Sequence, residues 1–414
     1  MQRELEFQAD RIETVLRLHR IEAQVTGGTV MPRWVRFQVL PGLGAKISRI
    51  RGLSEELACA LGAAVCRVSR QGRVVAVEIP RTDPQPVRLL PLLRQCTTQS
   101  SFPPVTATLG LSEDGAPLLV RLPSPDVAHI LVAGATGSGK TVLLQTMILS
   151  LALTNPLRSV VFVLVAPQVR RFRAFNGLPH LARPIIGEVD EALEAFRSLV
   201  RLMEWRSRLE WSGRQPRVVV VVDEMADLLM VGGKPLRQAL TRLTQRGREA
   251  GIHVVAATQK PTSEVLGPLV KANFPVRLVG RVSSAQDART ATGWSGTGAE
   301  RLLGRGDFVA VAEGRVIRFQ AAYVTAAEIE GALRRLRDFS DRSDRRGTVR
   351  FSSVSTTSSP SPDPSWPPIV ERPPEVPLPL LWTAVQQAIG RFKGHVSGAW
   401  RRRFALRFRR SPVG

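Results

Sequence analysis

The residues best suited to chemistry lie in one short glycine-rich segment, GATGSGKT, which matches the pattern GxxxxGK[ST]. Glycines let the backbone turn tightly and point N–H groups at phosphate oxygens, and the helix that follows adds its positive end. A lysine here can reach the β and γ phosphates, and a Thr hydroxyl can hold Mg²⁺. The predicted binding loop for ATP and Mg²⁺ comprises Gly134, Ala135, Thr136, Gly137, Ser138, Gly139, Lys140 and Thr141.

A second candidate group is the pair Asp223 and Glu224, which follows the five valines 218–222. A buried strand would deliver both carboxylates to its carboxyl end, where open α/β sheets bind ligands. We expect Asp223 to hold Mg²⁺, directly or through water, and Glu224 to orient and deprotonate the water that attacks the γ-phosphate. The alternative is an Asp-Glu pair that only caps a helix starting at Met225.

A third apolar run, residues 252–259, ends in Gln259, which is placed to sense the γ-phosphate or to help hold the water. Phosphoryl transfer also needs positive charge beyond the loop lysine and Mg²⁺, and an arginine commonly supplies it. The predicted helix 235–250 presents four candidates, most of which we expect to be solvated: Arg237, Arg242, Arg246 and Arg248.

These groups need a scaffold, and the order of the elements predicts one. Residues 124–338 alternate apolar strands with amphipathic helices, which is typical of an α/β domain with a mainly parallel sheet covered on both faces. The expected strands are 129–133, 160–166, 217–222 and 252–257. Residues 1–123 mix helical and alternating patterns and predict a small α+β domain.

The end of the chain has a different composition. Residues 339–380 are rich in Ser and Pro and predict a disordered linker, because they cannot bury enough apolar surface to fold. Residues 381–414 hold many basic residues and no acidic one. We interpret this basic tail as a nonspecific DNA clamp, with a merely solvated end as the alternative.

The charge of the whole chain limits the partners. A net charge of +23 favours a polyanion, either nucleic acid or an anionic membrane surface. Three cysteines without CxxC spacing argue against a disulfide framework or a zinc site and favour a reducing compartment. No apolar run approaches the ~18 to 20 residues that span a bilayer, and the N-terminus lacks the apolar core of a signal peptide. We therefore expect a cytoplasmic protein without direct membrane insertion.

Taken in order, GATGSGKT, VVVVVDEMADLL, ATQKP (residues 257–261) and LLGRGD resemble the FtsK/SpoIIIE family of DNA translocases over residues 5–335. The resemblance implies a RecA-like P-loop core that assembles as a hexameric ring around double-stranded DNA and pulls it by ATP hydrolysis. It places Lys140 and Thr141 in the Walker A motif, Asp223 and Glu224 in the Walker B motif, and Gln259 at the sensor position.

The resemblance also assigns residues that spacing alone does not. Arg248 matches the arginine finger that acts on a neighbouring subunit, which completes a catalytic set of Lys140, Glu224, Gln259 and Arg248. Lys260 and Lys271 match DNA-facing positions of the ring channel. Two departures stand out: Ala285 replaces a frequent Lys, and Ala166-Pro167-Gln168 replaces the usual Asp-Pro-Lys.

The leading hypothesis is an ATP-dependent translocase of double-stranded DNA, acting in chromosome segregation or in DNA transfer. Within the same superfamily, a conjugation or mobile-element ATPase is the main alternative. A secretion ATPase that moves polypeptide fits the charge less well. A nonenzymatic DNA-binding regulator on an inactive motor scaffold fits poorly with the complete set Lys140, Thr141, Asp223 and Glu224. The tail faintly resembles the start of the winged-helix module that often ends this family.

Overall fold

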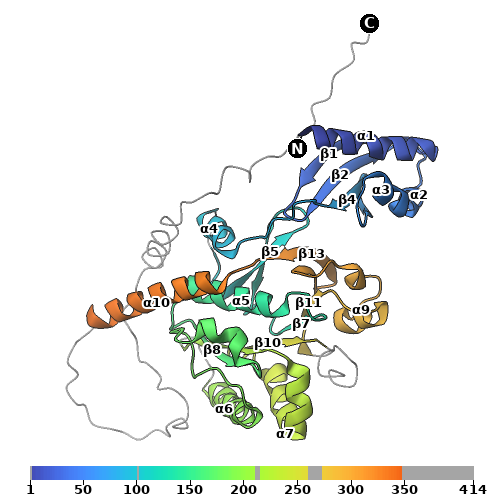
Figure 1. Cartoon of the computed structure of the whole chain (residues 1–414). Helices are drawn as coiled ribbons and strands as arrows, with labels where there is room; N and C mark the ends of the chain where they lie inside the picture. The colour runs from blue at the N-terminus through green and yellow to red at the C-terminus, as the bar shows by residue number, and fades with distance from the viewer. Residues whose placement is uncertain (1, 100–101, 210–214, 260–272, 347–414) are drawn as a thin grey trace, which may run out of the picture. The chain divides into compact units, whose positions relative to one another are not determined.

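The computed structural model describes residues 2–99, 102–209, 215–259 and 273–346 (Figure 1). The predicted linker and basic tail lie outside these residues from position 347 onward. The chain divides into two compact units, the first holding Met1–Pro86 and the second beginning at Val87.

The first unit is built on a four-stranded antiparallel sheet in the order β1-β2-β4-β3. Helix α1 packs on this sheet through Ile12 and Leu16, which are fully buried with Phe37 and Val39 of β2. The unit is therefore a small α+β fold, as the mixed pattern predicted. Its elements are α1 (Gln2–Leu18), β1 (Ala23–Val30), β2 (Trp34–Pro41), α2 (Ile47–Gly52), α3 (Ser54–Ala60), β3 (Arg67–Gln71) and β4 (Val74–Pro80).

The second unit contains a nine-stranded sheet, and its parallel half carries the strands that the sequence predicted. Five neighbouring strands run parallel in the order β11-β7-β10-β9-β8. Their Val-rich sequences are buried on both faces, which explains why they read as continuous apolar runs. The strands are β7 (Ile130–Ala133), β8 (Val160–Val165), β9 (Arg217–Val222), β10 (Ile252–Thr258) and β11 (Val276–Gly280).

The other half of this sheet is antiparallel, so the whole sheet is mixed rather than mainly parallel. It consists of β12 (Asp307–Ala312), β13 (Arg315–Ala321), β5 (Thr106–Ser112) and β6 (Pro117–Arg121). The predicted boundary at residue 123 differs from the observed one at Pro86, because β5 pairs with β13, about two hundred residues further along the chain. Helix α4 (Leu89–Gln99) also belongs to the second unit.

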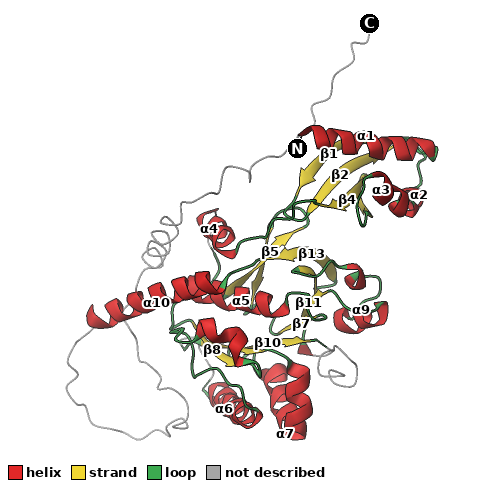
Figure 2. Ribbon diagram, in the orientation of Figure 1, coloured by secondary structure: helices red, strands yellow, loops and turns green. Residues whose placement is uncertain are grey.

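Helices cover both faces of the sheet, as Figure 2 shows. Alternate residues of β7 demonstrate this, because Ile130 and Val132 join the apolar core that includes α5, whereas Leu131 and Ala133 join the core that includes α6 and α7. The helical elements are α5 (Lys140–Thr154), η1 (Val169–Phe175), α6 (Val189–Arg208), α7 (Met225–Arg246), α9 (Ala285–Thr292), η2 (Ala299–Arg301) and α10 (Ala326–Arg346). Within the described ranges, none of the helices has both the length and the apolar character needed to cross a bilayer.

Candidate nucleotide site

The predicted binding loop connects β7, which ends at Ala133, to α5, which begins at Lys140. Two of its glycines have positive φ and no room for a side chain. A Cβ on Gly134 (φ 151°) would lie 2.8 Å from Ser138 Oγ, and one on Gly139 (φ 107°) would lie 2.9 Å from the amide nitrogen of Gly306. The loop conformation therefore depends on glycine at both positions.

A second loop, just before β12, holds the binding loop in place through the backbone. The amides of Arg305 and Gly306 donate to the carbonyls of Gly137 and Ser138 at 3.0 and 2.8 Å. The residue types did not predict this contact between the two loops. The LLGRGD segment, which contains Arg305 and Gly306, stood out only through the family resemblance. These two bonds anchor the nucleotide loop to the segment that leads into β12, the first strand of the antiparallel half of the sheet.

The Lys140 side chain lies inside the loop and is largely buried. Its Nζ donates to the carbonyls of Gly134 at 2.7 Å and Ala135 at 3.1 Å. Burial lowers the pKa of Lys140, while the carboxylates of Glu224 and Asp223 act in the opposite direction. The ammonium is thus held by neutral acceptors, which an anion can replace.

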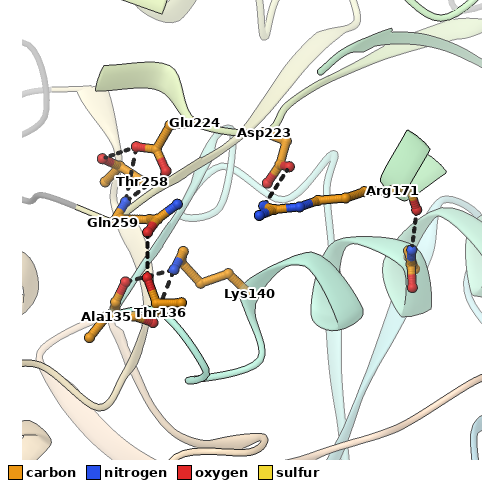
Figure 3. A network of polar contacts seen from close by, with 10 residues as sticks. Ala135, Thr136, Lys140, Arg171, Asp223, Glu224, Thr258 and Gln259 are labelled. Carbon is orange, nitrogen blue, oxygen red and sulfur yellow. Dashed lines mark hydrogen bonds and ion pairs between the residues drawn. The ribbon is translucent and has the colours of Figure 1, made fainter. Parts of the chain in front are cut away.

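Glu224 links the ends of two strands. It is the residue before α7, with φ 69°, but its side chain makes no hydrogen bond to the start of that helix, so its carboxylate does not serve as a helix cap. Its carboxylate instead accepts from the backbone amide of Gln259 at 3.0 and 3.2 Å and from the Thr258 hydroxyl at 3.2 Å. Gln259 Oε1 in turn accepts from the Thr136 hydroxyl at 2.7 Å. Figure 3 shows this chain of bonds beside Lys140.

Asp223 points toward a residue that the sequence reasoning missed. Its carboxylate is almost fully buried and lies 3.6 Å from Nη1 of Arg171, on η1 (Figure 3). Burial raises the pKa of Asp223, while Arg171, Lys140 and a hydrogen bond from Thr141 oppose that rise. No pattern in the sequence marked Arg171, which follows the departure Ala166-Pro167-Gln168 by three residues.

Arg248 is not part of this cluster. It is exposed in the turn after α7, and its carbonyl accepts from the amide of Gly251, just before β10 begins. Gln259 lies just beyond the other end of the seven-residue strand β10, about 20 Å away at ~3.3 Å per residue. Lys260 and Lys271 lie outside the described residues. The structure therefore gathers Lys140, Thr141, Asp223, Glu224 and Gln259, and leaves Arg248 apart.

A glycine-rich loop between a parallel strand and a helix, with carboxylates at the end of a neighbouring strand, defines the fold of a P-loop ATPase. Solved structures agree with this fold. The chain is similar to the conjugation coupling protein TcpA of pCW3 bound to ATPγS (TM-score 0.56, 18% identity, 80% of this chain and 99% of that one). It is also similar to the cytoplasmic domain of the type VII secretion ATPase EccC of Thermomonospora curvata (TM-score 0.52, 25% identity, 61% of this chain and 34% of that one).

The chain belongs to the FtsK/SpoIIIE family. The model of that family matches residues 88–210 and 207–263, and the model of the FtsK alpha domain matches residues 1–81. The DNA translocase FtsK of Sporosarcina ureae is 32% identical over 80% of this chain and 45% of its own length. The DNA translocase SftA of Bacillus subtilis (strain 168) is 32% identical over 80% of this chain and 37% of its own length. The chain thus spans less than half the length of these relatives.

Proposed function

We propose that this protein hydrolyses ATP to move double-stranded DNA. The observation that carries the proposal is the set of polar groups at the carboxyl ends of β7, β9 and β10, beside Lys140. Gln259 links the other two residues there, since its side chain accepts from Thr136 and its backbone amide donates to Glu224. Membership of the FtsK/SpoIIIE family supports DNA as the substrate.

In this proposal the residues of the binding loop, 134–141, hold the phosphates. The backbone amides of the loop and the positive end of α5 attract the oxygens, and Lys140 exchanges the carbonyls of Gly134 and Ala135 for the β and γ phosphates. Glu224 accepts a proton from the attacking water. The side chain of Gln259 positions that water, because the backbone amide of Gln259 is bonded to the Glu224 carboxylate and holds the residue beside the base.

The residues beside Lys140 suit Mg²⁺. The Thr141 hydroxyl forms a hydrogen bond with the Asp223 carboxylate, so two hard oxygen ligands for a metal ion lie next to each other. These two residues would hold the ion. When bound, Mg²⁺ neutralises negative charge on the phosphate oxygens.

Arg248 acts on a neighbouring subunit in this proposal. It lies at the end of β10 opposite to Gln259, so its guanidinium cannot reach the nucleotide of its own chain. An exposed arginine at that place is available to a second copy, which supports assembly into a ring, of six subunits by the family resemblance. Trans-acting arginines of this kind stabilise the charge of the transition state in other nucleotide hydrolases.

The DNA contacts come from basic residues that the structure does not describe, Lys260 and Lys271, together with the tail 381–414. A net charge of +23 supports contact with phosphates rather than bases, which gives a grip that is independent of sequence and falls with salt. A motor that steps along any sequence requires such a grip. We propose a cytoplasmic location, with a role in chromosome segregation or in DNA transfer.

The direct experiment compares ATP hydrolysis by the purified chain without nucleic acid, with duplex DNA and with an unfolded polypeptide of matched length. We expect duplex DNA to raise the rate at least severalfold, and expect the stimulation to disappear as salt rises, since each released counterion contributes to the salt dependence. Equal rates with and without DNA would refute the proposal. Stimulation by polypeptide alone would favour a secretion ATPase.

A further inference from the structure

Arg171 is the one charged residue in Figure 3 that the proposed function leaves without a role. Its guanidinium lies 3.6 Å from the Asp223 carboxylate, and its side chain is 40% exposed whereas that of Asp223 is 5% exposed. The charge of Arg171 also contributes to lowering the pKa of Lys140, so it acts on both sides of the site. An arginine between a phosphate-binding lysine and a metal-binding carboxylate is well placed to contact a bound nucleotide.

The backbone of Arg171 is held in place, whereas its side chain is half-exposed beyond its contact with Asp223. The next residue, Phe172, is buried in the core, and so is Phe175 at the end of η1. The carbonyl of Arg171 accepts from Nε2 of Gln145 on α5, at 2.7 Å. The backbone of Arg171 is therefore bonded to α5, the helix that begins with Lys140. Rotation about the side-chain torsion angles can redirect the guanidinium without moving this backbone.

The charges of the site indicate when such a redirection happens. Lys140 and Arg171 are positive and Asp223 and Glu224 are negative, so the four charges cancel. A cation on Asp223 makes the guanidinium redundant there and repels it. A triphosphate at the same time brings excess negative charge within reach, and arginine binds phosphate oxygens with a planar, two-pronged set of donors.

We propose that Arg171 binds the terminal phosphate of a nucleoside triphosphate in its own subunit, after leaving Asp223. This inference rests on the proposed ATP binding, but not on the movement of DNA. It makes Arg171 a residue that distinguishes triphosphate from diphosphate. A diphosphate lacks the terminal phosphate that the guanidinium would bind, so Arg171 adds little to its affinity whether or not the side chain leaves Asp223.

The test measures equilibrium binding of fluorescently labelled ATPγS and ADP to the full chain, with Mg²⁺ and without DNA. Arg171→Gln should weaken ATPγS binding about tenfold, the loss expected for one charge-assisted hydrogen bond, and should change ADP binding less than about twofold. Arg173→Gln is the matched control, since Arg173 is exposed on the same short helix and has no side-chain bond to the described residues. It should change neither affinity.

Arg171→Lys is a second variant, which keeps the positive charge but loses the planar pair of N–H donors. We expect it to lower the affinity for ATPγS less than Arg171→Gln does, and to leave the affinity for ADP unchanged. If Arg171→Gln does not fold, the lysine variant alone decides. Equal weakening of both nucleotides, or no weakening, would overturn the role of Arg171 while leaving the translocase proposal intact. A wild-type chain that binds neither nucleotide would refute both, and one that binds ATPγS but ignores DNA would refute only the translocase.

Discussion

Glu78 in the first unit and Asp223 in the second are both buried carboxylates, but their basic partners differ. In the first unit, Glu78 on β4 meets Arg36 on β2, with Arg36 Nε 2.6 Å from Glu78 Oε1 and both side chains about 5% exposed. In the second unit, Asp223 is just as buried, yet its nearest cation is a half-exposed Arg171 at 3.6 Å. The first pair is closed within the sheet. The second carboxylate has a partner that can be replaced.

Charged residues that serve only the fold differ from those that bind a ligand in whether another group can reach them. A buried ion pair in which both partners are enclosed can only contribute to the fold, because nothing else can reach it. A buried carboxylate at the open end of a parallel sheet, with a raised pKa and an exchangeable partner, is destabilising unless a ligand completes it.

Glu224→Gln should abolish turnover and spare binding. The amide cannot accept the proton of the attacking water, so we expect the hydrolysis rate to fall about 10²- to 10⁴-fold, the usual contribution of a general base. Binding of ATPγS should stay within a few-fold of wild type. Asp227→Asn, an exposed carboxylate in the first turn of α7, is the control and should retain activity. Comparable turnover in both variants would remove Glu224 from the mechanism.

Glu78→Gln should damage the first unit without touching the site. Removing one partner of a buried pair leaves the Arg36 charge uncompensated, which costs about 3–5 kcal/mol. Hydrogen exchange of the β2 and β4 amides should report the loss, and Glu55→Gln, on an exposed carboxylate of α3, should leave it unchanged. Replacing both partners with apolar residues should cost less than either single change. A double variant that costs the sum of the two would contradict a coupled pair.

Asp223→Asn should leave the nucleotide-free protein at least as stable as the wild type, whereas Glu78→Gln should destabilise it. Because the pKa of Asp223 is raised in the folded state, the folded protein binds more protons than the unfolded chain, and stability falls as pH rises from about 3.8 through the raised pKa. The amide does not titrate. The nucleotide-free variant should therefore melt at or above the wild-type temperature at pH 7, and the difference in melting temperature should be smaller near pH 4. The variant should also need a higher Mg²⁺ concentration to bind ATPγS. A variant that melts well below wild type at pH 7 would show that Asp223 is structural after all.

The three thiols should differ in reactivity. Cys59 is exposed, whereas Cys66 and Cys96 are buried, and burial raises the pKa of Cys66 to about 12 and that of Cys96 in the same direction. Since the thiolate is the reactive form, titration with a thiol reagent at pH 8 should modify Cys59 more than tenfold faster than the other two. Unfolding should equalise the three rates. Fast modification of Cys66 in the native protein would show that the first unit opens readily.

Much of the second unit was predictable because its signals are local. Residues 218–222 form one buried strand of a parallel sheet, so five consecutive valines predict both the strand and the position of Asp223 and Glu224 at its end. The GATGSGKT loop likewise fixes its own surroundings, since a strand must precede it and a helix must follow it. In the structure, the side chain of Gln259 bonds to Thr136 and its backbone amide bonds to Glu224, so the ends of these three strands lie together.

The remainder was not predictable from local patterns. The pairing of β5 with β13 joins residues near 111 to residues near 320, and no periodicity encodes such a partner. Arg171 escaped notice for a similar reason, because it is one of three arginines in VRRFRAF and only the fold shows which one faces Asp223. The predictions for Lys260, Lys271 and the basic tail remain predictions, since they concern residues that the structure does not describe.

Movement along duplex DNA driven by ATP can be measured as the displacement of a third strand from a triple helix built into linear duplex DNA. The wild-type chain should release the third strand with ATP and Mg²⁺, ATPγS should not support release, and Glu224→Gln should release none. Hydrolysis of ATP at a DNA-stimulated rate with the third strand left in place would contradict it.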